Sequence, residues 1–349
     1  MRAIWIERQS PQGPVHPQVR CVDDCAEPGG PGPGEVLLET EFTALNHMDL
    51  WVGRGIPGID IQYPHVGGVD AVARVLECGS GVDASWRGQR ILFNAAVAQA
   101  PPVVPYVPPT DSRLPEYHLI GEHSWGTHRA RFLAPVSQVA AIGDHDGASA
   151  CAFGLTALTA YGMMCTKGQL RPGQSVLITG IGGGVATAAL ALARHLGCPT
   201  AVTSRVPHKL EAARALGAQC LILDQGQDWS AEVRSWTSKR GVDMAVDTVD
   251  KATHLCCIKS LTRGGAYVCA GATSGPAATT DLARLFWHQL RILGSTMGSR
   301  AEFLEVVALL LAGRVSPVID SVRPWTEAAD AWRRLEAGEQ MGKLVLDWR

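Results

Sequence analysis

Apolar positions in the second half of the chain follow two alternating spacings. Short runs of aliphatic residues predict six strands, at 175–180, 200–204, 219–223, 242–247, 265–270 and 290–296. Between these runs the apolar residues recur at helical spacing, which predicts helices at 184–196, 207–216, 228–239, 252–261 and 281–287. Strands that alternate with helices are typical of a doubly wound parallel sheet. The pattern therefore predicts an α/β domain over 151–298.

The first 150 residues carry a different pattern. Prolines and glycines are frequent, helical spacing is rare, and short apolar runs predict strands at 35–45, 71–78 and 90–93. The proline-rich segment 99–115 predicts no regular structure. This part of the chain is therefore expected to be mostly β.

The C-terminal segment predicts two more helices and a strand, at 301–313, near 326–337 and at 343–348. Because the six-stranded sheet is already complete, we expect this segment to return to the first domain. The predicted domains are then 1–150 with 299–349, and 151–298.

Composition fits a folded enzyme of two domains. The chain has 349 residues, of which 46% are hydrophobic and 18% charged, and a net charge of −2 gives no reason to expect nucleic acid as a partner. The ten cysteines lack the paired spacing of a zinc ribbon. Neither a signal peptide nor an apolar run of about 20 residues is visible. We expect a cytoplasmic protein that acts on a small molecule, without a membrane.

Residues 175–186, SVLITGIGGGVA, combine a strand, a glycine turn and the start of a helix. Glycine lets the backbone approach phosphates, and a helix N-terminus offers free N–H groups and a positive dipole end. The segment is predicted to bind a dinucleotide pyrophosphate through Gly180, Gly182, Gly183, Gly184 and Val185. The alternative is a glycine-rich loop in an ordinary α/β protein.

The end of the second strand of this sheet carries no carboxylate. An acidic residue at this place binds the ribose 2′-hydroxyl of NAD, whereas a small residue with a cation accepts the 2′-phosphate of NADP. Ser204 and Arg205, with Lys209 one turn into the next helix, therefore predict NADPH as the cofactor. Alternatively, Arg205 is a solvated surface residue.

Seven further segments carry a recognisable combination of residues. They are ALNHMDLWVGRG at 44–55, PHVGGVDAVARVLECGSGV at 64–82, HKLEAARALGA at 208–218, GVDMAVDTV at 241–249, GGAYVCAGATSG at 264–275, LGSTMGSRAEF at 293–303 and GKLVL at 342–346. With the glycine turn they resemble the medium-chain dehydrogenase/reductase superfamily, and most of all its zinc-alcohol-dehydrogenase-like and quinone-oxidoreductase-like members. The resemblance implies a GroES-like catalytic domain, a Rossmann domain, and a homodimer paired through the sixth strand.

The resemblance also implies metal ligands that this chain lacks. Zinc-dependent members carry a cysteine where this chain has Asn46, a His-Glu pair where it has Val69 and Asp70, and a cysteine near Leu155. Valine and leucine cannot coordinate a metal, and a catalytic zinc ion needs about three protein ligands. The interval 94–120, where the structural zinc lobe belongs, contains no cysteine. We therefore expect neither zinc ion.

Without a metal, the resemblance implies reduction of a quinone or an α,β-unsaturated carbonyl. Hydride adds to the β-carbon, the charge spreads into an enolate, and hydrogen-bond donors stabilise it. NADPH-dependent reduction of an activated C=C bond or a quinone is the leading hypothesis. Three alternatives stay open: a zinc-free ketone or imine reductase, a redox-neutral tailoring enzyme, and a protein that binds NADPH without turnover.

Asn46 is expected to line the cleft and to donate from its amide to a substrate oxygen, and His47 to donate a proton or to contact the cofactor phosphates. The further catalytic candidates are Asp49 and Tyr63, and the candidates for the substrate wall are Trp51, Asp70, Phe286 and Trp287. Structural alternatives exist for most of them, such as a turn residue, loop support or a subunit interface.

The nicotinamide half of the cofactor is expected at the carboxyl ends of the later strands. The candidate contacts there are Thr248, Gly271, Ala272, Ser295 and Met297. Lys343 resembles a late lysine that reaches the cofactor phosphates in relatives.

Overall fold

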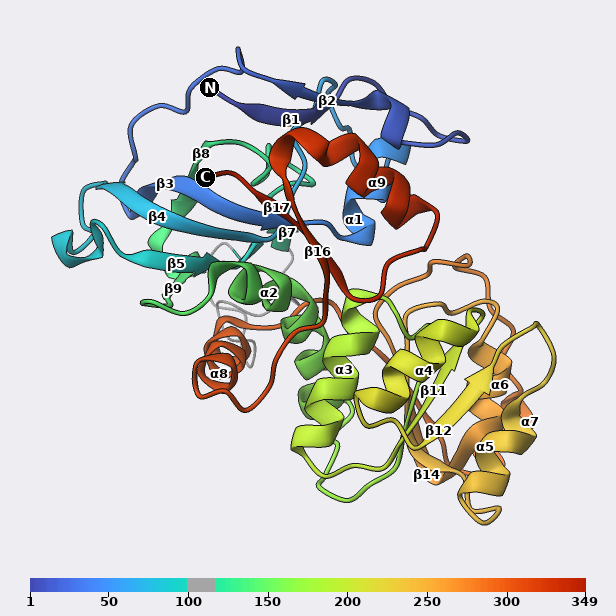
Figure 1. The fold of residues 1–349 in the computed structure, drawn as a ribbon. Helices are drawn as coiled ribbons and strands as arrows, with labels where there is room; N and C mark the ends of the chain where they lie inside the picture. The colour runs from blue at the N-terminus through green and yellow to red at the C-terminus, as the bar shows by residue number, and fades with distance from the viewer. Residues whose placement is uncertain (99–116) are drawn as a thin grey trace. The chain divides into compact units, whose positions relative to one another are not determined.

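The computed structural model describes residues 1–98 and 117–349 (Figure 1). The predicted irregular segment 99–115 lies outside the described residues. The chain divides into two compact units. Unit 1 comprises Met1–Leu155, Ser299–Gly313 and Pro317–Arg349, and unit 2 comprises Thr156–Gly298 and Arg314–Ser316. The first boundary falls within helix α2 (Gly147–Tyr161), slightly later than the predicted residue 150.

Unit 2 is built around a six-stranded parallel sheet with the strand order β12-β11-β10-β13-β14-β15. The strands are β10 (Val176–Ile178), β11 (Thr200–Ser204), β12 (Cys220–Leu223), β13 (Val242–Asp247), β14 (Leu261–Cys269) and β15 (Arg291–Gly294). The helices are α3 (Gly184–His195), α4 (Pro207–Ala215), α5 (Ser230–Trp236), α6 (His254–Ser260) and α7 (Leu282–Trp287). This confirms the predicted doubly wound sheet. Its order reverses between β10 and β13, and in such sheets ligands bind beside the reversal at the carboxyl ends of the strands.

The central strands of unit 2 are mostly apolar and buried because helices cover the sheet. Leu177, Ala201 and Ile222, on β10, β11 and β12, are completely buried in one cluster that also contains Trp229 and Tyr267. Such continuous apolar runs made these strands readable in the sequence.

Unit 1 is built around a mostly antiparallel sheet in the order β16-β17-β3-β4-β5-β9, with β8 paired to β3. Its strands are β3 (Glu35–Ala44), β4 (Ala71–Cys78), β5 (Arg90–Phe93), β8 (Arg131–Pro135), β9 (Val139–Ala141), β16 (Ile319–Pro324) and β17 (Lys343–Asp347). Smaller pairs form between β1 (Ala3–Ile6) and β2 (Val19–Val22), and between β6 (Ala96–Ala98) and β7 (Tyr117–Leu119). The helices wholly within this unit are α1 (His47–Arg54), α8 (Arg300–Leu311) and α9 (Ala328–Glu336).

The C-terminal segment completes the sheet of unit 1. Strand β17 pairs with β3 in antiparallel register, with Val345 opposite Ala44. This pairing brings Lys343, the first residue of β17, beside the end of β3, where helix α1 begins.

Among the described residues, one helical stretch, Gly147–Lys167, is long and apolar enough to cross a membrane, although no such run was predicted from the sequence. Within the described residues, 78% of its apolar window is buried inside the protein. That degree of burial is typical of a core helix in a soluble protein, so the stretch is weak evidence for a membrane span.

Candidate functional site

The glycine turn of unit 2 has the backbone that a phosphate site requires. Gly180 and Gly182 have φ values of +63° and +118°, which side chains with a Cβ rarely adopt. The turn is held to the neighbouring strand, because the Ile181 N–H donates to the Thr203 carbonyl at 2.8 Å. Helix α3 begins at Gly184 directly after the turn, and its first N–H groups are available to an anion. These residues fit a dinucleotide pyrophosphate.

Two cations follow β11 in the chain, Arg205 directly after the strand and Lys209 in helix α4. Arg205 is exposed, and its guanidinium has no hydrogen-bond or ion-pair partner among the described residues. Lys209 is buried, and its stem packs against the turn, since a Cβ added to Gly182 would lie 2.7 Å from its Cδ and 3.1 Å from its Nζ. The Ser204 hydroxyl accepts the N–H of Val206 at 3.1 Å.

The predicted nicotinamide contacts lie at the carboxyl ends of β13, β14 and β15. A Cβ on Gly271 would lie 3.2 Å from the Thr248 carbonyl oxygen, so the first two ends are in contact. The Ser295 hydroxyl is buried with no hydrogen-bond partner among the described residues. Met297 follows with φ +49°, and its sulfur accepts the Thr159 hydroxyl at 3.6 Å. An unpaired buried hydroxyl at this edge fits a bound amide group. Ala272 lies in the turn after β14, where its carbonyl accepts the Gly275 N–H.

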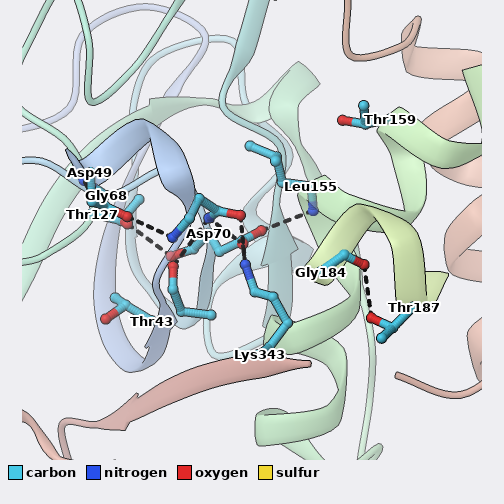
Figure 2. A network of polar contacts seen from close by, with 12 residues as sticks. Thr43, Asp49, Gly68, Asp70, Thr127, Leu155, Thr159, Gly184, Thr187 and Lys343 are labelled. Atoms are coloured by element: carbon cyan, nitrogen blue, oxygen red, sulfur yellow. Dashed lines mark hydrogen bonds and ion pairs between the residues drawn. The ribbon is translucent and has the colours of Figure 1, made fainter. Parts of the chain in front are cut away.

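In unit 1, three predicted site residues form one buried polar network. The Lys343 ammonium donates to the Asn46 Oδ1 at 2.6 Å and to the Asp70 Oδ2 at 2.9 Å (Figure 2). The Asn46 amide donates to the same Asp70 oxygen at 2.9 Å and to the Ala44 carbonyl at 3.2 Å. The other Asp70 oxygen accepts the Leu155 N–H at 2.9 Å. We call Asn46, Asp70 and Lys343 the buried triad.

This network changes the expectation for Asn46 and bears on the one for Lys343. Both amide protons of Asn46 are already donated within unit 1, so the amide has none left for a substrate oxygen. The Lys343 ammonium is held by the other two members of the triad. Its predicted contact with the cofactor phosphates stays a prediction.

Asp49 supports the backbone around the triad. One carboxylate oxygen accepts the Asn46 N–H at 2.8 Å and caps helix α1, and the other accepts the Gly68 N–H at 3.2 Å. That second oxygen also lies 3.1 Å from the His128 Nε2. Since its side chain is 1% exposed, Asp49 is suited to loop support rather than to chemistry.

The positions that carry zinc ligands in zinc-dependent relatives do not fit a metal ion here. Val69 is buried in an apolar cluster of unit 1, and Leu155 packs against the same cluster. In the described ranges, no group of three His, Cys, Asp or Glu side chains is arranged to hold a metal. The polar side chains at this place are those of the buried triad, in which Lys343 is itself a cation.

The other candidates are dispersed. The Tyr63 hydroxyl donates to the Val52 carbonyl, burial raises the pKa of Tyr63, and the ring borders a cavity of about 300 Å³ whose lining also includes Asp60. His47 is the first residue of α1 and is half-buried, as is Trp51 one turn later.

Phe286 and Trp287, two of the candidates for the substrate wall, do not lie at the carboxyl edge of the sheet. They lie on α7 and are 70% and 66% exposed. The carbonyl of the next residue, His288, accepts the Gly264 N–H near the start of β14, at the opposite end of the strand from the nicotinamide contacts. Their exposure excludes a place in the core of the unit and leaves a subunit interface as the structural alternative.

The pairing of Lys343 with Asp70 and Asn46 was not predicted from the sequence. The signal was weak but present, because Asp70 interrupts the apolar run before β4 and Lys343 opens the apolar strand β17. Asp250, which lies after β13, was not predicted as a site residue either. The Tyr267 hydroxyl donates to it at 2.7 Å, and its pKa is raised to about 6, mainly by burial and further by the neighbouring Asp247 carboxylate.

Two family descriptions match the chain. Residues 32–144 match the alcohol dehydrogenase GroES-like domain, and residues 184–312 match the zinc-binding dehydrogenase domain. A solved NAD-dependent alcohol dehydrogenase superposes with a TM-score of 0.89 at 31% identity, over 100% of both chains. The chain is thus an oxidoreductase of the medium-chain dehydrogenase/reductase superfamily, whose members use pyridine nucleotides.

Curated relatives agree with this assignment over most of their length. The zinc-type alcohol dehydrogenase-like protein YogA of Leptosphaeria maculans is 28% identical over 339 residues, which cover 91% of each chain. The NAD-dependent alcohol dehydrogenase of Saccharolobus solfataricus is 24% identical over 339 residues, covering 92% of this chain and 93% of its own.

Proposed function

We propose that the protein reduces an activated C=C bond, in an enone, an enoyl thioester or a quinone, with hydride from NADPH and without a metal ion. The observation that carries this proposal is the buried triad, which supplies a protein cation where residues 46 and 70 meet, beside positions occupied by valine and leucine. Unit 2 would hold the cofactor and unit 1 the substrate. When bound, NADPH supplies the hydride.

The chemistry favours a conjugated substrate. In a simple ketone the full charge develops on one oxygen, which usually calls for a Lewis acid or a strong proton donor. In an enone or a quinone the charge is delocalised, and a hydrogen-bond donor suffices. A ketone or imine reductase is the second candidate, because an ammonium is also able to donate to a localised oxyanion.

The test is an assay of NADPH oxidation against enones, enoyl thioesters, quinones, ketones and imines, with the metal content of tag-free protein measured in parallel. We expect turnover of the first three classes, and no loss of activity after chelation. Stoichiometric zinc whose removal abolishes turnover would contradict the proposal. Bound NADPH without turnover of any class would favour the non-catalytic alternative.

NADPH is proposed over NADH because Arg205 offers an exposed guanidinium without a partner among the described residues, at the strand end where a 2′-phosphate binds. Arg205→Ser is expected to lower the ratio of kcat/KM for NADPH over NADH by about tenfold or more, since a charge-assisted hydrogen bond contributes about 1.5–3 kcal/mol. The control is Arg214→Ser, which removes an exposed arginine from α4, the helix that follows Arg205. An unchanged ratio would mean that Arg205 does not bind the 2′-phosphate and is a solvated surface residue.

A homodimer paired through β15 is also proposed. This strand lies at the edge of its sheet, and Arg291 and Ile292 on it are exposed. Leu282, Phe286 and Trp287 on the preceding helix are each at least 66% exposed, an unusual concentration of apolar surface. Light scattering should give a dimer for the wild type and a monomer for Trp287→Glu.

A further inference from the structure

The buried triad contains an ion pair that stability alone does not explain. The Lys343 side chain is 3% exposed and the Asp70 side chain is completely buried, with 2.9 Å between the ammonium and the carboxylate. Removing two charges from water is costly, and apolar side chains of similar volume are often as stabilising as such a pair. The pair therefore calls for a role beyond holding unit 1 together.

A count of hydrogen bonds shows which group of the triad has a donor to spare. Asn46 uses both amide protons and its carbonyl oxygen within the network. Asp70 is a carboxylate and only accepts. The Lys343 ammonium has three N–H groups, and only two have acceptors among the described residues, on Asn46 and Asp70. One N–H of a buried ammonium is left over.

The network also determines where this N–H group is held. Asn46 is locked in one orientation, because a flipped amide would turn its oxygen toward the Asp70 carboxylate and its nitrogen toward the ammonium. The Leu155 backbone N–H holds the other oxygen of Asp70 at 2.9 Å. The resemblance puts zinc ligands at position 46 and near position 155, so the ammonium, which is bonded to Asn46, lies close to the place expected for a Lewis acid.

We propose that Lys343 is a catalytic residue that takes the part of the metal, donating its remaining N–H to the substrate oxygen on which negative charge develops. Asn46 and Asp70 are the positioning residues. This inference rests on the proposed function. If bound NADPH supplied a hydride and became NADP⁺, a C–H bond would form at the β-carbon and the π electrons would move through the conjugated system to that oxygen. The α-carbon, or the oxygen in a quinone, then takes a proton from water.

Lys343→Met tests the role of the charge, because it preserves the length of the side chain. We expect kcat to fall about 10²–10³-fold, as when an oxyanion donor is removed, with an unchanged Kd for NADPH in a fluorescence titration. Lys259→Met removes a half-buried lysine from an Asp228 pair of similar distance and is the control. A Kd for NADPH that rises tenfold while kcat is retained would show a phosphate contact and overturn the proposal.

The single variant leaves Asp70 without its counter-charge, which endangers folding. The double variant Asp70→Asn with Lys343→Met removes both charges and is expected to fold, to bind NADPH and to remain at the low kcat. Wild-type turnover in this folded double variant would overturn the proposal.

A binding measurement separates this inference from the proposed function. Calorimetry with the NADP⁺-loaded protein compares 4-nitrophenolate, which presents an anionic oxygen, with neutral 4-nitroanisole. We expect the wild type to bind the phenolate at least tenfold more tightly and Lys343→Met to lose that preference. Equal preference in both proteins would overturn the role of Lys343. A preference lost in the variant, without turnover of any activated alkene, would overturn the proposed function alone.

Discussion

Replacing Asp250 with asparagine should make unit 2 more stable at high pH and leave its stability at low pH nearly unchanged. Asp250 has φ +65°, a conformation that asparagine adopts readily, so the backbone is not strained by the change. One carboxyl oxygen accepts the Tyr267 hydroxyl at 2.7 Å, and the other is buried with no hydrogen-bond partner among the described residues. The Tyr267 hydroxyl also lies 3.2 Å from the Asp247 carboxylate. The single hydroxyl proton of Tyr267 is therefore shared between two carboxyl groups, those of Asp250 and Asp247.

The expected change in the free energy of unfolding follows from the pKa of Asp250. Burial is the main cause that raises the pKa of Asp250 from 3.8 to about 6, and the Asp247 charge adds to it, against the hydrogen bond from Tyr267. The folded protein therefore binds more protons than the unfolded chain between these values. Stability from the neutral carboxyl is fully present below about pH 4 and is lost as the pH rises through about 6. The full difference is at most about 3 kcal/mol, and partial solvation reduces it to about 1–2 kcal/mol.

The assay is the difference in Tm between Asp250→Asn and the wild type, measured from pH 4 to pH 8, since the loss begins at the unfolded pKa of 3.8. Since asparagine does not ionise, we expect a difference near zero at low pH that grows to a few degrees in favour of the variant at pH 8. Glu211→Gln, at a carboxylate that is 67% exposed on α4, is the control and should show no such trend. A pH-independent difference, or a variant that is less stable at pH 8, would refute the reasoning.

Three further outcomes are expected. Gly182→Ala should weaken NADPH binding at least tenfold in a fluorescence titration, because φ is +118° and the new Cβ would meet the Lys209 stem at 2.7 Å. Gly79→Ala should lower Tm by several degrees, since its Cβ would lie 1.9 Å from the Gly32 carbonyl oxygen, and calorimetry would show it. Glu336→Gln should destabilise unit 1 by about 1–3 kcal/mol in urea unfolding, because this carboxylate receives Arg54 at 2.9 Å and two backbone N–H groups.

Much of unit 2 was predictable because its information is local. The central strands β10 and β11 are buried along their whole length, apolar positions recur at helical spacing in helices such as α3, and the turn at Gly180–Gly184 lies directly between a strand and a helix. The six predicted strands and the turn between β10 and α3 follow from such neighbouring residues. The family likewise follows from segments read along the chain.

The chemistry of unit 1 was decided by tertiary structure. Lys343 is 297 positions from Asn46 and 273 from Asp70, and no periodicity in the sequence connects residues so far apart. Only the pairing of β17 with β3 brings the ammonium to the amide. The sequence determined that positions 46, 69 and 155 lack metal ligands. The structure decided that a buried lysine lies among them and that the Asn46 amide has no proton to spare, because hydrogen bonds depend on distance in space and not on order along the chain.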